Sequence, residues 1–258
     1  MDKEALSAYA DYLRRVVGGY LYGTQQGSDF CEVCRAPVNG YSLCIACNNA
    51  RGASIRLGFQ LANHVYPIAY ANDNPQSTLL MHGYKENYDP NLEPNELYLK
   101  IMLLIITAVG LHIDCFQNPL QSITYVPSSK GRVNHPLQRV AKFLSQKFDL
   151  EFVQAQYVPS MTSDSREINP DQYDLEAIPT DLGHTLILED TWVTGAHAQS
   201  LAAKLRNVGA NEVSVLVVAR WLQTNWPATG HFIEGEIKNR GYDPNDCPFS
   251  FNHCKLTL

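Results

Sequence analysis

The sequence predicts an α/β protein, with a mostly parallel, twisted sheet flanked by helices and a small cysteine-rich module near the N-terminus. Two observations in the 258-residue chain support this. From about residue 122 onward, short apolar runs alternate with segments whose apolar residues recur at helical spacing. Before that, four cysteines fall into two close pairs. Alternating strands and helices require crossover connections, which make neighbouring strands parallel and cover both faces of the sheet.

The first part of the chain predicts a helix, then two short strands joined by a polar turn, then a second helix. Residues 3–17 show an amphipathic helical pattern that ends at Gly18-Gly19, where two residues without Cβ disfavour helix continuation. Residues 64–84 show two short apolar runs around the sequence NDNP, which predicts two strands joined by a turn. Residues 95–110 are helical and strongly apolar, so we expect this helix to pack on the sheet.

The rest of the chain supplies the alternating pattern. Strands are predicted at 122–127, 150–155, 184–190 and 212–220, and helices at 135–148 and 196–210. Ligands of such sheets bind beyond the carboxyl ends of the strands. The expected organisation is an N-terminal helix (1–28), a cysteine module (29–50), the main α/β domain (51–222) and a C-terminal extension (223–258).

Composition narrows the class of protein. Hydrophobic residues make up 45% of the chain and charged residues 18%, which argues against disorder. The net charge of −6 gives no general attraction to nucleic acid, so such binding would need a local basic patch. The first residues lack the basic-then-apolar layout of a secretion signal, and the apolar run at 101–113 is too short to span a bilayer. We therefore expect a cytoplasmic protein without membrane insertion.

The cysteine module predicts a metal site. Cys31-x2-Cys34 is followed, nine residues later, by Cys44-x2-Cys47, a spacing that brings four thiolates to one tetrahedral Zn²⁺. A closed four-cysteine site is structural and does not indicate a reaction. Contact between such a zinc ribbon and DNA stays open, because only Arg35, Arg51 and Arg56 supply positive charge nearby.

An acidic pair, Glu189-Asp190, ends the predicted strand at 184–190 and is followed by the sequence TWVTGAH, which we call the phosphate loop (191–197). Burying two adjacent carboxylates is costly unless a partner offsets the charge. The loop enters a helix, whose first N–H groups and positive dipole end favour a phosphate. The two carboxylates suit ribose hydroxyls or a divalent cation. The alternative is an ordinary strand end followed by a helix cap.

This stretch, LILEDTWVTGAH, resembles the phosphoribosyl pyrophosphate (PRPP) signature of type I phosphoribosyltransferases. The resemblance implies that fold, with Glu189 and Asp190 on the ribose hydroxyls. It also implies a set of residues around the 5′-phosphate: Thr191, Val193, Thr194, Gly195, Ala196 and His197. Trp192 and His197 depart from the usual pattern, in which a small aliphatic residue and a Ser or Thr stand at these positions.

A four-cysteine ribbon ahead of a PRPP-type domain is similar to the competence-associated ComF family, phosphoribosyltransferase-like proteins linked to DNA uptake. The resemblance covers roughly residues 29–220 and includes the segments LLMHGYKEN and SREINPDQYDL, which place Lys85 and Arg166 near the site. It also includes the stretch ITYVPSSKGRV, whose counterpart holds pyrophosphate. The residues of that basic loop are Ser128, Ser129, Lys130, Gly131 and Arg132.

The resemblance implies a PRPP-binding protein that uses Mg²⁺ and transfers the phosphoribosyl group with release of pyrophosphate. The alternative is a non-catalytic PRPP- or nucleotide-binding adaptor in DNA uptake or repair, whose ribbon contacts single-stranded DNA or a DNA-processing protein. A base-salvage phosphoribosyltransferase is a third interpretation, disfavoured because such enzymes do not generally carry a four-cysteine ribbon. The sequence leaves open the acceptor, the oligomeric state and whether the protein is an enzyme at all.

The remaining cysteines allow two interpretations. Cys247, His253 and Cys254 near the C-terminus have part of a metal-site spacing but lack a fourth ligand, and buried thiols in a C-terminal cap are the preferred interpretation. Cys115 has no partner nearby in sequence, so we expect it in the core.

Overall fold

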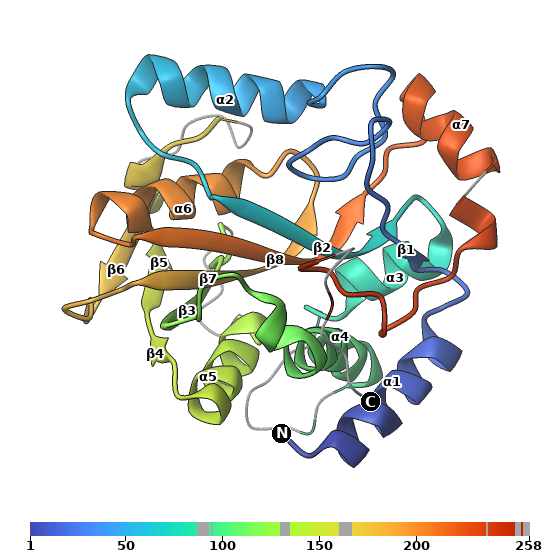
Figure 1. The fold of residues 1–258 in the computed structure, drawn as a ribbon, viewed down its shortest axis with the longest axis horizontal. Coiled ribbons are helices and arrows are strands. Elements are labelled where there is room, and N and C mark those ends of the chain that lie inside the picture. The colour runs from blue at the N-terminus through green and yellow to red at the C-terminus, as the bar shows by residue number, and fades with distance from the viewer. Residues whose placement is uncertain are drawn as a thin grey trace.

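The computed structural model describes residues 1–86, 93, 95–129, 135–159, 167–235, 237–250 and 254. Its centre is a six-stranded sheet in the order β1-β2-β8-β7-β3-β4 (Figure 1). The strands are β1 Tyr22–Gly23, β2 His64–Ala71, β3 Ser122–Tyr125, β4 Glu151–Phe152, β7 His184–Trp192 and β8 Glu212–Trp221. All neighbours pair in parallel except β1, which runs antiparallel to β2. The predicted α/β architecture with a mostly parallel sheet is confirmed.

Helices cover both faces of the sheet, as its apolar strands require. In Figure 1, helices α1 Lys3–Val16, α4 Glu96–His112 and α5 Pro136–Phe148 lie on one face, and α2 Ile45–Leu57 and α6 Ala196–Asn207 on the other. Strand β7 shows the alternation, because Leu186 and Leu188 enter the core on the α4 side while Ile187 enters the core on the α6 side. Further helical segments among the described residues are α7 Pro227–Gly235, η1 Ile113–Cys115, η3 Pro170–Gln172 and η4 Ile237–Asn239.

The order of the strands creates a crevice between β3 and β7. From β3 the chain passes through α5 to β4, toward one edge of the sheet, whereas from β7 it passes through α6 to β8, in the opposite direction. The loops that leave the carboxyl ends of β3 and β7 therefore diverge to opposite faces. In open α/β sheets such a switch point is where ligands bind.

Two sequence predictions about secondary structure were wrong. The second strand predicted within 64–84 is the helix α3, Pro75–Gly83, because Asn74 accepts a hydrogen bond from the Gln76 N–H and Pro75 stands in its first turn, where no N–H is needed. The strand predicted at 150–155 is two short strands. Beyond β4 the chain continues as β5, Gln154–Tyr157, which leaves the main sheet and pairs antiparallel with β6, Tyr173–Glu176.

Helix α4 is longer than its apolar run suggested. The helical stretch Glu96–Cys115 spans 20 residues, so its length and composition alone would allow it to cross a membrane. However, 61% of its most apolar window is buried within the fold, and its side chains pack on α1, α5 and the sheet. This burial is typical of a central core helix.

Candidate functional site

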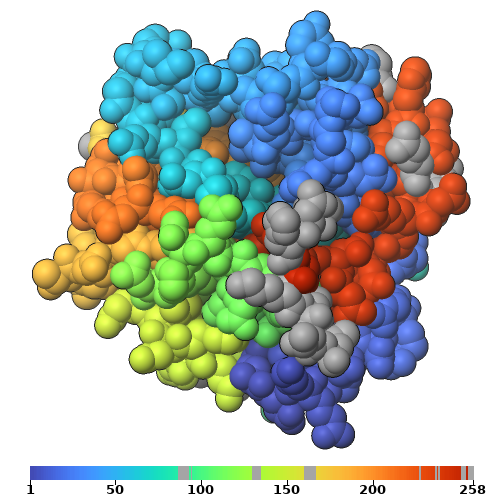
Figure 2. Space-filling view, in the orientation of Figure 1, coloured from blue at the N-terminus to red at the C-terminus, as the bar shows by residue number. Residues whose placement is uncertain are grey.

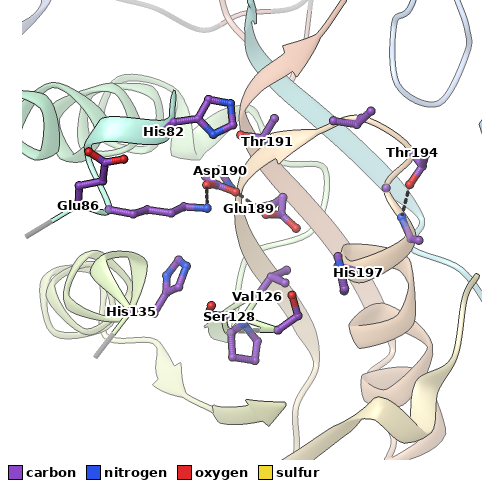
Figure 3. Close-up of a pocket in the computed structure, with 16 residues that line it drawn as sticks. His82, Glu86, Val126, Ser128, His135, Glu189, Asp190, Thr191, Thr194 and His197 are labelled. Atoms are coloured by element: carbon purple, nitrogen blue, oxygen red, sulfur yellow. Dashed lines mark hydrogen bonds and ion pairs between the residues drawn. The ribbon is translucent and has the colours of Figure 1, made fainter. Parts of the chain in front are cut away.

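A cavity of about 520 Å³ lies at the carboxyl ends of β3 and β7, at the switch point of the sheet (Figure 3). Three segments line it: the end of α3 with the turn after it, the loop after β3, and the end of β7 with the phosphate loop. In Figure 3 the labelled His82, His135, Ser128 and His197 surround the acidic pair. The fold thus brings together residues that are more than a hundred positions apart in sequence.

The acidic pair lies at the base of this cavity. Glu189 is 9% and Asp190 5% exposed, so both carboxylates are largely removed from bulk water. The ammonium of Lys85 forms an ion pair with Asp190 Oδ2, and the hydroxyl of Tyr84 donates to the same oxygen at 2.7 Å. Glu189 Oε1 accepts from the backbone N–H of Asp190 at 3.0 Å. The two side chains therefore have different surroundings although they are adjacent in sequence.

These surroundings shift the pKa values of the two carboxyl groups in opposite directions. Burial, with the neighbouring Asp190 charge, raises the pKa of Glu189 well above its ordinary value. Burial acts on Asp190 in the same sense, but the Lys85 charge and the hydrogen bonds from its neighbours outweigh it, so the pKa of Asp190 is lowered. The pair thus carries its negative charge mainly on Asp190. Two close carboxyl groups with separated pKa values are a recurrent feature of functional sites.

The phosphate loop leads into a helix start suited to an anion. Gly195 is the N-cap of α6 with φ 80° and has no side chain to cap the helix, while the Thr194 hydroxyl oxygen accepts a long hydrogen bond, 3.4 Å, from the Ala196 N–H. The first N–H groups of a helix lack intrahelical partners, and a helix N-terminus carries partial positive charge. A Cβ at Gly195 would lie 2.1 Å from Trp192 Cζ2, so the loop conformation requires glycine there.

Trp192, which departs from the PRPP signature, points away from the cavity. Its side chain is 1% exposed and belongs to the core on the α6 side, so it supports the loop from beneath. Its carbonyl accepts a hydrogen bond from Arg220 Nη1 at 2.9 Å. Arg220 Nε also lies 3.3 Å from Cys34 Sγ. The phosphate loop is thus connected through one buried arginine to the four-cysteine module.

His197, the second departure, faces the cavity from the first turn of α6. Its Nδ1 lies 3.1 Å from the Tyr173 hydroxyl. Burial lowers the pKa of His197, and the Asp190 charge opposes this only in part. A neutral imidazole carries one N–H donor, which replaces the hydroxyl expected from a Ser or Thr at this position.

The cavity collects most of the residues predicted from sequence. Those lining it are Lys85, Ser128, Ser129, Glu189, Asp190, Thr191, Val193, Thr194, Gly195, Ala196 and His197. Lys130, Gly131, Arg132 and Arg166 lie outside the described residues. Sequence reasoning missed Tyr84 and His135. Tyr84 is adjacent to Lys85, but only the packing of α3 reveals that its hydroxyl points toward Asp190.

The four-cysteine module is a compact cluster packed on the α6 side of the sheet. The sulfurs of Cys31, Cys34, Cys44 and Cys47 are buried and lie within 4.8 Å of one another. Cys34 Sγ and Cys44 Sγ are 3.7 Å apart. Four sulfurs bound to one Zn²⁺ at about 2.3 Å would be roughly 3.8 Å apart, so the donor set and spacing fit one zinc ion.

Comparison with known proteins gives likenesses of structure only. No protein-family model matches the sequence, and no curated protein matches it. Among solved structures, an adenine phosphoribosyltransferase is 15% identical and aligns with 56% of this chain and 98% of its own, at a TM-score of 0.34. The Saccharomyces cerevisiae enzyme, complexed with an imino-altritol bisphosphate and adenine, is 13% identical over 67% of this chain and 89% of its own (TM-score 0.33). The adenine phosphoribosyltransferase from Leishmania tarentolae is 11% identical over 57% of this chain and 88% of its own (TM-score 0.34).

Proposed function

We propose that this protein binds PRPP or a related phosphoribosyl ligand, with Mg²⁺, in the cavity at the carboxyl ends of β3 and β7. The observation that carries the proposal is the juxtaposition of the buried acidic pair with the glycine-capped start of α6 at the switch point of the sheet. A ribose 5-phosphate presents this combination of groups, since its vicinal hydroxyls donate hydrogen bonds and its phosphate is an anion.

Each element of the cavity has a defined part in the proposed binding. Asp190, kept ionised by Lys85 and Tyr84, accepts hydrogen bonds from the ribose hydroxyls. The N–H groups at the start of α6, together with Thr194 and His197, donate to the 5′-phosphate. Ser128 and Ser129, after β3, line the same cavity, and in this proposal their hydroxyls donate to the pyrophosphate. The resemblance to type I phosphoribosyltransferases implies the same division of roles.

The cavity also fits a hard divalent cation. Mg²⁺ prefers oxygen ligands and is commonly bound by one or two carboxylates together with the oxygens of a phosphorylated substrate. Glu189 and Asp190 supply such oxygens beside the cavity. When bound, Mg²⁺ neutralises charge that develops on a leaving pyrophosphate.

If the protein transfers the phosphoribosyl group, a nitrogen nucleophile forms a bond to the anomeric carbon while the bond from that carbon to the pyrophosphate oxygen breaks. The electron pair of the broken bond leaves with pyrophosphate. The protein contributes by positioning the two reactants and stabilising the departing charge, and no side chain has to form a covalent intermediate. The zinc of the four-cysteine module is structural in this proposal.

The second candidate, a binding adaptor without transfer activity, is favoured by the surface of the four-cysteine module and α2. Tyr41, Ile45 and Ile55 are 72%, 73% and 76% exposed, and Arg51 and Arg56 are exposed on the same helix as the two isoleucines. These elements form the blue edge at the top of Figure 2. Exposed apolar side chains beside cations are typical of a surface that contacts a protein or single-stranded nucleic acid.

Calorimetric titration with PRPP in the presence and absence of Mg²⁺ tests the binding proposal. We expect wild-type protein to bind, and Asp190→Asn to weaken binding by roughly 10- to 100-fold, because a hydrogen bond to a charged group contributes about 1.5–3 kcal/mol. Glu151→Gln, which changes an exposed carboxylate on β4, is the matched control and should bind as wild type does. Absence of binding by the wild-type protein, or equal binding by Asp190→Asn, contradicts the proposal.

Release of pyrophosphate separates the enzyme from the adaptor. Wild-type protein with PRPP and Mg²⁺ is incubated with a panel of bases and amines. Release that depends on one acceptor and is lost in Asp190→Asn supports transfer. Binding of PRPP without release supports the adaptor, for which a salt-dependent shift of single-stranded DNA, lost on Arg51→Gln/Arg56→Gln, is then expected.

A further inference from the structure

A second cluster of metal-binding side chains lies on the opposite side of the sheet from the four-cysteine module. It consists of His112, Cys115, Cys247 and Cys254, and we call it the histidine–cysteine cluster. The four ligand atoms lie within 4.8 Å of one another. Two of these residues end the long core helix α4 and the short η1 that follows it, and the other two belong to the C-terminal segment, which lies beside α4 in Figure 1.

We propose that the histidine–cysteine cluster binds a second zinc ion, which ties the C-terminal segment to the end of α4. One histidine and three cysteines are an established donor set for closed, structural zinc sites. The C-terminal segment supplies two ligands, Cys247 and Cys254. The other two, His112 and Cys115, lie more than 130 positions earlier in the chain than either of them. Cys115 is therefore a member of a cluster rather than an isolated core thiol. His253 lies outside the described residues.

The distances within the cluster agree with a tetrahedral ion. Cys115 Sγ and Cys254 Sγ are 3.8 Å apart, and Cys254 Sγ lies 3.4 Å from His112 Nδ1. With Zn–S at about 2.3 Å and Zn–N at about 2.05 Å, a regular tetrahedron has edges of roughly 3.8 Å between sulfurs and roughly 3.5 Å between sulfur and nitrogen. The corresponding distance in the four-cysteine module, 3.7 Å between Cys34 and Cys44, is nearly the same.

The groups around the cluster provide a second, independent observation. His112 is fully buried, and its Nε2 lies 3.0 Å from the Pro244 carbonyl oxygen, which can only accept a hydrogen bond. The proton of the neutral ring is therefore on Nε2, so Nδ1 presents a lone pair to the cysteines. A metal-binding histidine usually donates its other ring N–H in this way. The Ser250 N–H donates to Cys247 Sγ at 3.3 Å, so the backbone of the C-terminal segment also orients this sulfur.

A zinc ion accounts for this arrangement better than a disulfide or chance packing does. A disulfide would join two of the three sulfurs and leave the histidine lone pair facing a third thiol. The sulfurs of Cys115 and Cys254 are 3.8 Å apart, whereas a disulfide bond is about 2.05 Å long. Packing of independent thiols would not require the ring orientation that Pro244 fixes.

Zinc stoichiometry of the full-length protein, purified without added chelator and passed through a desalting column, tests the proposal. All seven cysteines of the chain fall in the two clusters, so each cluster can be removed separately. We expect two zinc ions per wild-type chain, one in Cys254→Ser, one in His112→Gln, and one in Cys31→Ser/Cys34→Ser. His64→Gln, which alters a histidine outside both clusters, is the matched control and should retain two.

Two further measurements accompany the zinc stoichiometry. Thiol titration after unfolding under non-reducing conditions counts the free cysteines, and reconstitution with Co²⁺ counts the ions that thiolates bind. One zinc per wild-type chain overturns the proposal, whether all seven thiols react or two are lost to a disulfide. Two zinc ions that persist in both Cys254→Ser and His112→Gln also overturn it, since the second ion is then bound elsewhere. Cys254 is partly exposed near the C-terminus, so its substitution should leave the fold intact, as checked by circular dichroism. In wild-type protein the thiolate-to-Co²⁺ absorption should saturate at two equivalents, and in Cys254→Ser at one.

Discussion

The two cysteine clusters have similar geometry but differ in how far apart their ligands lie in the sequence. Each gathers four ligand atoms within 4.8 Å, but the four-cysteine module takes them from residues 31–47, whereas the histidine–cysteine cluster joins residue 112 to residue 254. In the first, short loops hold the ligands together, so the spacing in sequence predicts the site. In the second, the ligands meet only because the C-terminal segment packs against the end of α4.

The clusters also differ in what they support. The four-cysteine module contacts Arg220, which in turn holds the Trp192 carbonyl beneath the phosphate loop. The histidine–cysteine cluster contacts the end of α4 and the backbone of the C-terminal segment, on the other side of the sheet. We therefore expect loss of the first cluster to affect both folding and ligand binding, and loss of the second to affect mainly the attachment of the C-terminal segment.

The largest expected effect distinguishes the clusters by stability. Cys31→Ser/Cys34→Ser should lower the free energy of unfolding by about 4 kcal/mol or more, since the proposed zinc ion and part of the core on the α6 side would be lost together. Cys254→Ser should cost less, because its side chain is partly exposed at the edge of the fold. Urea unfolding followed by circular dichroism measures both. Equal losses would mean that the two clusters contribute alike to the fold.

A smaller effect is expected at the link between the module and the phosphate loop. Burial alone would lower the pKa of the Arg220 guanidinium, but the charge of the Cys34 sulfur raises it above its ordinary value, so Arg220 is charged in the core. Arg220→Met should destabilise the protein by about 2 kcal/mol, because the Trp192 carbonyl and the thiolate lose their donor.

The same substitution tests whether the link matters for binding. If Arg220 positions the loop, Arg220→Met weakens PRPP binding while the zinc content stays at the wild-type value. Arg206→Met, which changes an arginine on α6 that bonds to the Ala210 carbonyl, is the control and should bind PRPP normally. Unchanged PRPP affinity in Arg220→Met would show that the loop keeps its conformation without this contact.

Features set by local sequence were predicted, and features set by packing were not. The cysteine pairs and the acidic pair with its glycine were found because neighbours in sequence fix their geometry. The sequence predicts a strand in place of α3, because the short apolar run Leu79-Leu80-Met81 fits a strand as well as a helix, although Asn74-Pro75 is a helix-start signal. Tyr84 and the histidine–cysteine cluster depend on how α3 and the C-terminal segment pack, which no local spacing encodes.

Trp192 shows the same limit at a single position. It departs from the PRPP signature, because an indole stands where a small aliphatic residue is usual. In the structure the indole lies below the loop, in the space that a side chain at residue 195 would need. Trp192 and Gly195 therefore depend on each other, because the indole fits only where residue 195 has no side chain. The effect of Trp192 on the loop depends on the direction of its side chain, which the sequence alone does not determine.

Like the two cysteine clusters, the acidic pair gathers candidate metal ligands in a buried position. The smallest expected effect tests whether burial of its carboxyl groups lowers the stability of the fold. Because the pKa of Glu189 is raised in the folded protein, its contribution to stability is fully present below the unfolded-state pKa, about 4.3, and is lost as the pH rises through the folded-state pKa. Glu189→Gln removes this dependence on pH.

We expect the unfolding free energy of Glu189→Gln to exceed that of wild type by on the order of 1 kcal/mol at pH 8 and to approach it near pH 4. The exposed control Glu151→Gln should show no such divergence, and a Glu189→Gln protein that is less stable than wild type at pH 8 would indicate that the carboxylate stabilises the fold on its own.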